Sequence, residues 1–127
     1  MGLSVCYHKM DPSEETPHSC PTEATLTVIG GRWKVPILWN LFEGTCRFGE
    51  LSRRISGVTQ KMLTQQLREL EADGLIRRKV FPEVPPRVEY SATDLGRSLV
   101  PVVSALSAWG ERYLNERPAT SRSRKAA

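Results

Sequence analysis

The 127-residue sequence lacks the features that mark membrane proteins and the common enzyme classes. No apolar run is long enough to cross a bilayer and no signal peptide opens the chain, which predicts a cytoplasmic protein with no membrane partner. No P-loop, dinucleotide-binding fingerprint, nucleophile elbow or H-E-x-x-H motif is present. Both histidines lie near the N-terminus, where a catalytic base is poorly held in geometry. We therefore expect no enzymatic activity and no cofactor.

Cysteine is scarce, and the odd number of three residues argues against a disulfide framework. Cys20 directly precedes a predicted helix whose dipole favours a thiolate, so it is the candidate redox sensor; an inert small residue at a helix start is the alternative. Its partner after oxidation would be Cys46, in a predicted loop, or Cys6, and the sequence selects neither. Cys6 with His8, and His18 with Cys20, form two pairs whose side chains are suitable zinc ligands. Only one residue separates the two ligands within each pair, and this short spacing argues against a metal site.

What the chain does contain is the length of one compact domain and an excess of basic residues. Eighteen Lys and Arg against fourteen Asp and Glu give a formal net charge of +4, which permits a polyanionic partner without proving one. Residues 1–19 are polar with two prolines and predict a flexible arm, and residues 118–127 predict a basic, disordered tail. One folded domain is therefore expected over residues 20–117.

Start and stop signals divide this domain into short elements. Pro21 and the glycine pair after Ile29 delimit a first helix, Thr59 is a favoured N-cap, and Pro101 is expected to kink or restart the last helix. The runs LIRRKVF and RVEYSAT alternate as strands around the stiff tip PEVPP. The predicted helices cover residues 21–29, 33–43, 48–55, 60–73 and 94–117, and the strands cover 75–81 and 87–93. This order predicts a mainly α fold with a small antiparallel β-hairpin.

Two consecutive helices joined by Ser56-Gly57-Val58 form a helix-turn-helix candidate. The second is amphipathic, with leucines on one face and polar residues on the other, and it fits the major groove of B-DNA. Gln pairs with adenine, Arg with guanine, and Lys with a phosphate or guanine. The candidate DNA-binding residues of this helix and its cap are Thr59, Gln60, Lys61, Thr64, Gln65 and Arg68. Arg53 and Arg54, on the preceding helix, are expected to hold the DNA backbone.

The predicted hairpin adds a basic wing beside the second helix. Its candidate DNA contacts are Arg77, Arg78, Lys79 and Arg87. Strand alternation places Arg77 and Lys79 on one side and Arg78 on the other, so not all of them can contact DNA at once. Helix and wing together predict double-stranded DNA as the partner, and a merely solvated polar surface is the alternative.

The last predicted helix carries an apolar stripe that is larger than one packed face of a small domain needs. Its members repeat at helical period, and they are Leu95, Leu99, Val102, Val103, Leu106, Trp109 and Tyr113. The stripe predicts a dimer seam with Trp109 as a candidate anchor. Packing against the domain's own core is the alternative interpretation.

From roughly Cys20 to Tyr113 the chain resembles the HxlR family of bacterial winged-helix transcriptional regulators, relatives of the MarR group. The segments GRWKVPILW, RFGEL, LTQQLRELEADGLI and VEYSATDLGRSL carry the resemblance, and they are specific only in combination. The resemblance implies a winged helix-turn-helix domain with N- and C-terminal dimerisation helices, and a homodimer on a pseudo-palindromic operator. The equivalent of Cys20 senses oxidants or electrophiles in some members. The expected interface residues are Leu26, Leu99, Val103, Leu106, Trp109 and Tyr113.

Two functional hypotheses follow from these observations. The first is a sequence-specific, DNA-binding transcriptional regulator located on the nucleoid and responsive to an oxidant or a small-molecule effector. Repression, by blocking polymerase, is the commoner mechanism of such regulators. The second is a winged helix used as a protein-interaction module without specific DNA binding. The paired basic groups on helix and wing favour the first, since an interaction module does not need them.

Overall fold

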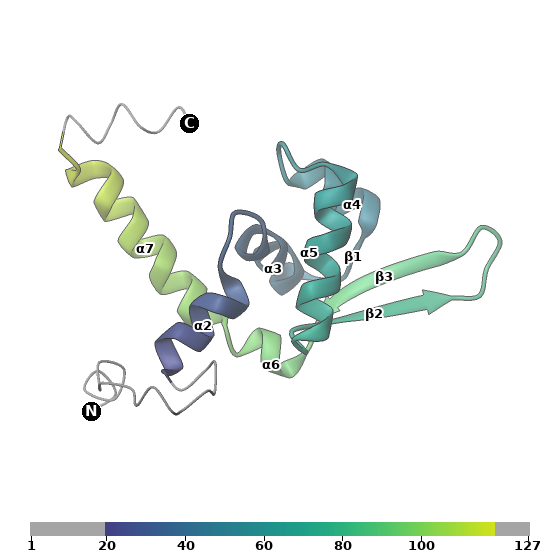
Figure 1. Cartoon of the computed structure of the whole chain (residues 1–127). Helices are drawn as coiled ribbons and strands as arrows, with labels where there is room; N and C mark the ends of the chain where they lie inside the picture. The colour runs from purple at the N-terminus through teal and green to yellow at the C-terminus, as the bar shows by residue number, and fades with distance from the viewer. Residues whose placement is uncertain (1–19, 119–127) are drawn as a thin grey trace.

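The computed structural model describes residues 20–118, which form a mainly helical domain with a small antiparallel sheet (Figure 1). The helices are α2 (Pro21–Ile29), α3 (Lys34–Glu43), α4 (Phe48–Arg54), α5 (Gln60–Ala72), α6 (Asp94–Arg97) and α7 (Val100–Glu116). The strands are β1 (Cys46–Arg47), β2 (Ile76–Phe81) and β3 (Arg87–Ala92). The fold class predicted from the sequence is confirmed. The N-terminal arm with Cys6, His8 and His18, and residues 119–127 of the tail, lie outside the described residues.

Local signals place the helix boundaries close to where the sequence predicts them. Pro21 begins α2, and Thr59 caps α5 by accepting a hydrogen bond from the Met62 N–H at 3.1 Å. The last predicted helix restarts rather than continuing: Thr93 caps the short α6, and Pro101 occupies the first turn of α7. As a result, only part of the predicted apolar stripe belongs to α7.

The sheet has the strand order β1-β3-β2, with both pairings antiparallel. The hairpin β2–β3 matches the prediction, and its register pairs Ile76 with Ala92 at the base. The sequence did not predict β1, in which Cys46 pairs with Tyr90. A two-residue strand contains no alternation to detect, because its conformation depends on pairing with a distant segment. The order leaves β2 at the sheet edge beside α5.

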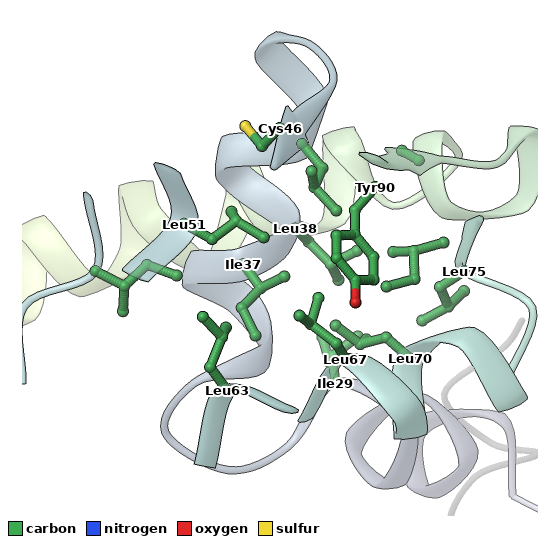
Figure 2. Packing of buried hydrophobic residues seen from close by; sticks show 14 residues of the cluster. Ile29, Ile37, Leu38, Cys46, Leu51, Leu63, Leu67, Leu70, Leu75 and Tyr90 are labelled. Carbon is green, nitrogen blue, oxygen red and sulfur yellow. The ribbon is translucent and has the colours of Figure 1, made fainter. Parts of the chain in front are cut away.

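One hydrophobic core joins the helices to the base of the sheet (Figure 2). Ile37 and Leu38 of α3 and Leu63 and Leu67 of α5 are at most 2% exposed, and the ring of Tyr90 lies among these side chains. Burying an aliphatic side chain of this size stabilises the fold by about 1.5–3 kcal/mol. The core therefore fixes α5 by its leucine face, which leaves the opposite face of the same helix in solvent.

Two elements project from this core on opposite sides (Figure 1). The tip of the β2–β3 hairpin extends to one side beyond α5, and α7 extends to the other, past α2. The outer part of each projection is not covered by another described element. The arrangement separates a surface made by α4, α5 and the hairpin from a surface made by α2 and α7.

Candidate nucleic-acid interface

A tight turn sets the geometry between α4 and α5. Gly57 has φ of 87°, a left-handed conformation that favours glycine, and its Cα faces the ring of Trp33. A Cβ at this position would lie 3.6 Å from that ring. The turn ends at Thr59, whose cap begins α5. These residues form the helix-turn-helix that the sequence predicts.

The solvent face of α5 carries most of the predicted base-reading groups. Gln60, Lys61, Gln65 and Arg68 are exposed, and Thr64 is half-buried. Thr59 uses its oxygen for the cap, although its hydroxyl hydrogen can still be donated. Among residues 20–118, no carboxylate forms an ion pair with Lys61 or Arg68. The structure therefore gathers an amide, an ammonium and a guanidinium on one accessible helix face.

A hollow of about 350 Å³ separates this helix from the hairpin. Its lining residues are Thr64, Leu67, Arg68, Glu71, Arg78 and Tyr90. Arg78 pairs with Tyr90 across the hairpin, so it lies on the face of the hairpin that is turned toward α5. Alternation places Arg77 and Lys79 on the other face. Two guanidinium groups against one carboxylate leave the hollow with a net positive charge.

Arg87 is already bound by other residues of the wing. Its guanidinium lies 3.1 Å from Glu83 and 3.6 Å from Glu89, and 4.0 Å above the ring of Phe81. The Lys79 ammonium approaches the same ring at 4.9 Å. These contacts stabilise the wing, and they make Arg87 a poor candidate for the free DNA contact that the sequence predicts.

The two arginines predicted to clamp the backbone from α4 differ in their surroundings. Arg54 donates a hydrogen bond to the Cys46 sulfur at 3.4 Å and lies 3.7 Å from Glu50. Arg53 is exposed, and it forms no ion pair with any residue in the part of the chain that is described. Arg53 is therefore the better placed of the two for a phosphate.

Cys46 lies in strand β1 and not in the predicted loop, and its side chain is 2% exposed. Burial raises the pKa of its thiol above the ordinary value, and the nearby Arg54 guanidinium offsets only part of that rise. A buried thiol with a raised pKa is a weak nucleophile. Cys20, by contrast, is the partly exposed N-cap residue of α2.

The α2 and α7 surface contains large apolar side chains in solvent. The most exposed predicted members are Leu26, Leu106, Trp109 and Tyr113, and the last two rings stack at 5.4 Å. Val103 is 2% exposed and packs α7 onto α3, so a second subunit would gain little surface from it. Leu99 is half-buried against the core. Trp39 of α3, 43% exposed, joins this surface in a groove with Leu106, and the sequence reasoning missed it.

A second set of residues missed by sequence reasoning links α3 to α5. The Lys34 ammonium lies 2.7 Å from Oε1 of Glu69, and the Lys34 side chain is only 9% exposed. Oε2 of Glu69 accepts a hydrogen bond from the Gln65 amide nitrogen at 2.8 Å. A lysine at the start of a mostly apolar helix was the available signal, because a buried ammonium requires an acidic partner.

Residues 20–118 contain neither a membrane-spanning helix nor a cluster of metal ligands. None of the helices there combines the length and the apolar character that a bilayer crossing requires. That part of the chain also brings no three His, Cys, Asp or Glu side chains together in a way that could hold a metal ion. Three of the four residues of the zinc alternative, Cys6, His8 and His18, fall outside it.

The helix-turn-helix and the adjoining hairpin define a winged helix-turn-helix domain. The family model of HxlR-like helix-turn-helix proteins matches residues 28–118. The HTH-type transcriptional regulator YdeP of Bacillus subtilis is 46% identical over 117 residues, which cover 92% of this chain and 91% of YdeP. The chain therefore belongs to the HxlR family of transcriptional regulators.

Solved structures of related regulators have the same fold. The redox regulator HypR in its reduced form is 50% identical with a TM-score of 0.71, over 73% of this chain and 92% of that chain. The reduced form of the transcriptional regulator YodB from B. subtilis is 32% identical with a TM-score of 0.66, over 83% of this chain and 95% of that chain. HypR has also been solved in an oxidised form, and YodB after diamide treatment.

Proposed function

We propose that this protein is a homodimeric, sequence-specific DNA-binding regulator of transcription. The observation that carries the proposal is the exposed face of α5, where Lys61 and Arg68 form no ion pair with any described carboxylate and the amide of Gln65 lies between them. Such a helix fits the major groove, where amide and guanidinium groups distinguish base edges. Membership of a family of transcriptional regulators supports the same function.

The hairpin supplies sequence-independent contacts in this proposal. With α5 in the major groove and the wing at the adjacent minor groove, the DNA strand between the two grooves passes over the hollow between helix and wing. Arg78 lines that hollow from the hairpin, so it binds its phosphates, while Arg68 on the α5 side reads a base edge. Arg77 and Lys79, on the other face, are left to contact the flanking backbone.

The α2 and α7 surface forms the dimer interface. Leu26, Leu106, Trp109 and Tyr113 are the side chains whose burial would stabilise the dimer. A twofold dimer presents two copies of α5, which matches an operator of two pseudo-palindromic half-sites. Occupying such an operator blocks polymerase, so repression is the proposed mode of control.

Cys20 is the proposed input for an oxidant or an electrophile. It lies at the start of α2, within the proposed interface region, so a change at this thiol acts on the geometry of the dimer. HypR, a similar protein, is a redox regulator solved in reduced and oxidised forms, which supports an oxidant as the effector. Cys20→Ser should keep reduced-state DNA affinity and lose the response to diamide. A mutant that still responds excludes Cys20 as the sensor.

Fluorescence anisotropy on duplex DNA from upstream of the protein's own gene tests the central claim. The reduced and oxidised proteins are titrated at two salt concentrations, with a scrambled duplex as the control. Gln65→Ala and Arg68→Ala should each reduce the preference for the upstream sequence by about 1–3 kcal/mol per lost base contact. Equal affinity of the wild type for both duplexes would refute specific binding and favour a protein-interaction module.

A further inference from the structure

The amide of Gln65 is held in one orientation by the side chain one turn later on α5. Its nitrogen Nε2 donates a hydrogen bond to Oε2 of Glu69 at 2.8 Å. The other oxygen of that carboxylate, Oε1, lies 2.7 Å from the Lys34 ammonium. Lys34 thus anchors Glu69 from α3, and Glu69 in turn orients Gln65 on the recognition face.

The chemistry of Lys34, Glu69 and Gln65 explains why the Gln65 amide adopts only one orientation. An ionised carboxylate accepts hydrogen bonds and donates none, so the nitrogen of Gln65, and not its oxygen, faces Glu69. The hydrogen bond from Lys34 holds the pKa of the Glu69 carboxyl below its usual range, which keeps the group ionised at neutral pH. The Lys34 side chain is 9% exposed, and a buried ammonium is costly without an anionic partner.

We propose that Glu69, anchored by Lys34, makes Gln65 a reader of adenine, an inference that rests on the proposed DNA-binding function. With one N–H on Glu69, Gln65 presents one remaining N–H and its carbonyl oxygen. Adenine offers the matching pair in the major groove, the N7 acceptor and the N6 amino donor. Guanine offers two acceptors, N7 and O6, so the carbonyl of Gln65 would face an acceptor there.

Changing Glu69 to glutamine reverses this selection. Lys34 still requires an acceptor and takes the carbonyl oxygen of the new amide, which leaves the new NH₂ group facing Gln65. Gln65 then turns its own carbonyl inward to accept that hydrogen bond. Both of its N–H groups point outward, and this pair of donors matches the N7 and O6 acceptors of guanine.

Removing the side chain altogether has a different effect. Glu69→Ala leaves Gln65 without a partner, so its amide adopts both orientations and reads adenine and guanine with similar affinity. The two substitutions remove the same ion pair with Lys34, but they differ in what they do to Gln65. A merely structural role for Glu69 predicts the same base preference in both variants.

Selection of duplexes from a randomised DNA library tests the inference. Gln65→Met first identifies the base position that Gln65 reads, because a methionine side chain keeps the length and loses the hydrogen bonds. At that position we expect adenine for the wild type, guanine for Glu69→Gln and no adenine–guanine preference for Glu69→Ala. The ratio of affinities for paired adenine and guanine duplexes should fall at least roughly tenfold from the wild type to Glu69→Gln.

The affinity ratio is measured on one protein preparation, so a loss of folded protein does not affect it. Lys34→Met provides a second variant, which removes the ammonium that holds Glu69 but changes no residue of α5. This variant should also weaken the adenine preference, and only at the base position that Gln65 reads. If the wild type enriches no sequence, the proposed function and this inference fail together. A wild-type consensus that Glu69→Gln leaves unchanged, or weakens equally at all positions, overturns the inference alone.

Discussion

Replacing Arg78 by alanine removes the guanidinium that the hairpin directs toward α5. Arg78 lines the hollow with Arg68, and in the proposed complex a backbone strand crosses this hollow between two grooves. Truncation at Cβ removes a charge from an exposed side chain and leaves the core intact. Arg78→Ala should therefore reduce DNA affinity without reducing the stability of the fold.

The size of the effect follows from the release of counterions. Each phosphate that a protein neutralises on duplex DNA contributes about 0.9 to the slope of log K against log salt concentration. A homodimer places two Arg78 side chains on one operator, so the slope should fall by about 1.8. Over a fourfold rise in salt, each such contact loses about 3.5-fold in affinity, and two lose about 12-fold. The advantage of the wild type over Arg78→Ala should shrink by that factor between 50 and 200 mM NaCl.

Anisotropy titrations of both proteins at four or more salt concentrations measure this slope. A fall of about 0.9 would indicate one contact per complex, and an unchanged slope would refute the placement of a phosphate in the hollow. Glu71→Gln is the matched control of opposite sign, since it removes the single carboxylate of the same hollow and should tighten binding. Arg77→Ala removes an equal charge on the opposite face of the same strand, and a smaller change in slope is expected there.

Three further predictions concern the stability of the fold and the reactivity of its thiol. Gly96→Ala should destabilise the fold by about 1–3 kcal/mol in urea denaturation, because a Cβ at this position would clash with the Leu75 carbonyl oxygen. The stability that Glu69 contributes should be present above the ordinary pKa of a glutamate and lost as the pH falls through its lowered folded pKa, so the melting temperatures of the wild type and Glu69→Gln should converge as the solution is made more acidic. Alkylation of Cys46 by iodoacetamide should be slow in the native protein and fast in urea, as followed by mass spectrometry.

Each of these three predictions has its own control and its own refuting result. Gly49→Ala adds a Cβ that would meet only the mobile end of Arg53, at 3.4 Å, so a loss as large as that of Gly96→Ala would point to general helix sensitivity. If the difference between the melting temperatures of the wild type and Glu69→Gln stays constant down to pH 3, the carboxylate is not stabilised by Lys34. Equal alkylation rates of Cys46 in the native and unfolded protein would contradict its burial.

Features of this fold that depend on local sequence could be predicted well. Pro21, Thr59 and the glycine of the turn at Gly57 act on their own backbone, through a fixed φ, a side-chain cap and a left-handed conformation. The leucine spacing of α5 identified the buried face, and therefore also the polar face. Most of the candidate interface on α5 follows from these local rules.

Features that depend on distant partners could not be predicted. The sequence predicts a loop at Cys46 because its strand exists only through pairing with Tyr90, more than forty positions along the chain. Arg87 has the charge of a DNA contact, but the hairpin register pairs it with Phe81, whose ring lies 4.0 Å from its guanidinium. Composition identifies which groups are available for binding, and the tertiary contacts decide which of them are already occupied within the protein.

Helix α3 connects the two surfaces on which the proposed function depends. On one side it forms with α7 a groove lined by Val35, Trp39 and Leu106, where a second subunit would pack against exposed apolar groups. On the other side Lys34 holds Glu69 of α5 at 2.7 Å. Close-packed interiors transmit displacement because they compress little, and coupling between sites requires a contiguous element of this kind. Any coupling between subunit packing at α7 and base reading at Gln65 would therefore require a shift of α3, the helix that holds Lys34 against Glu69.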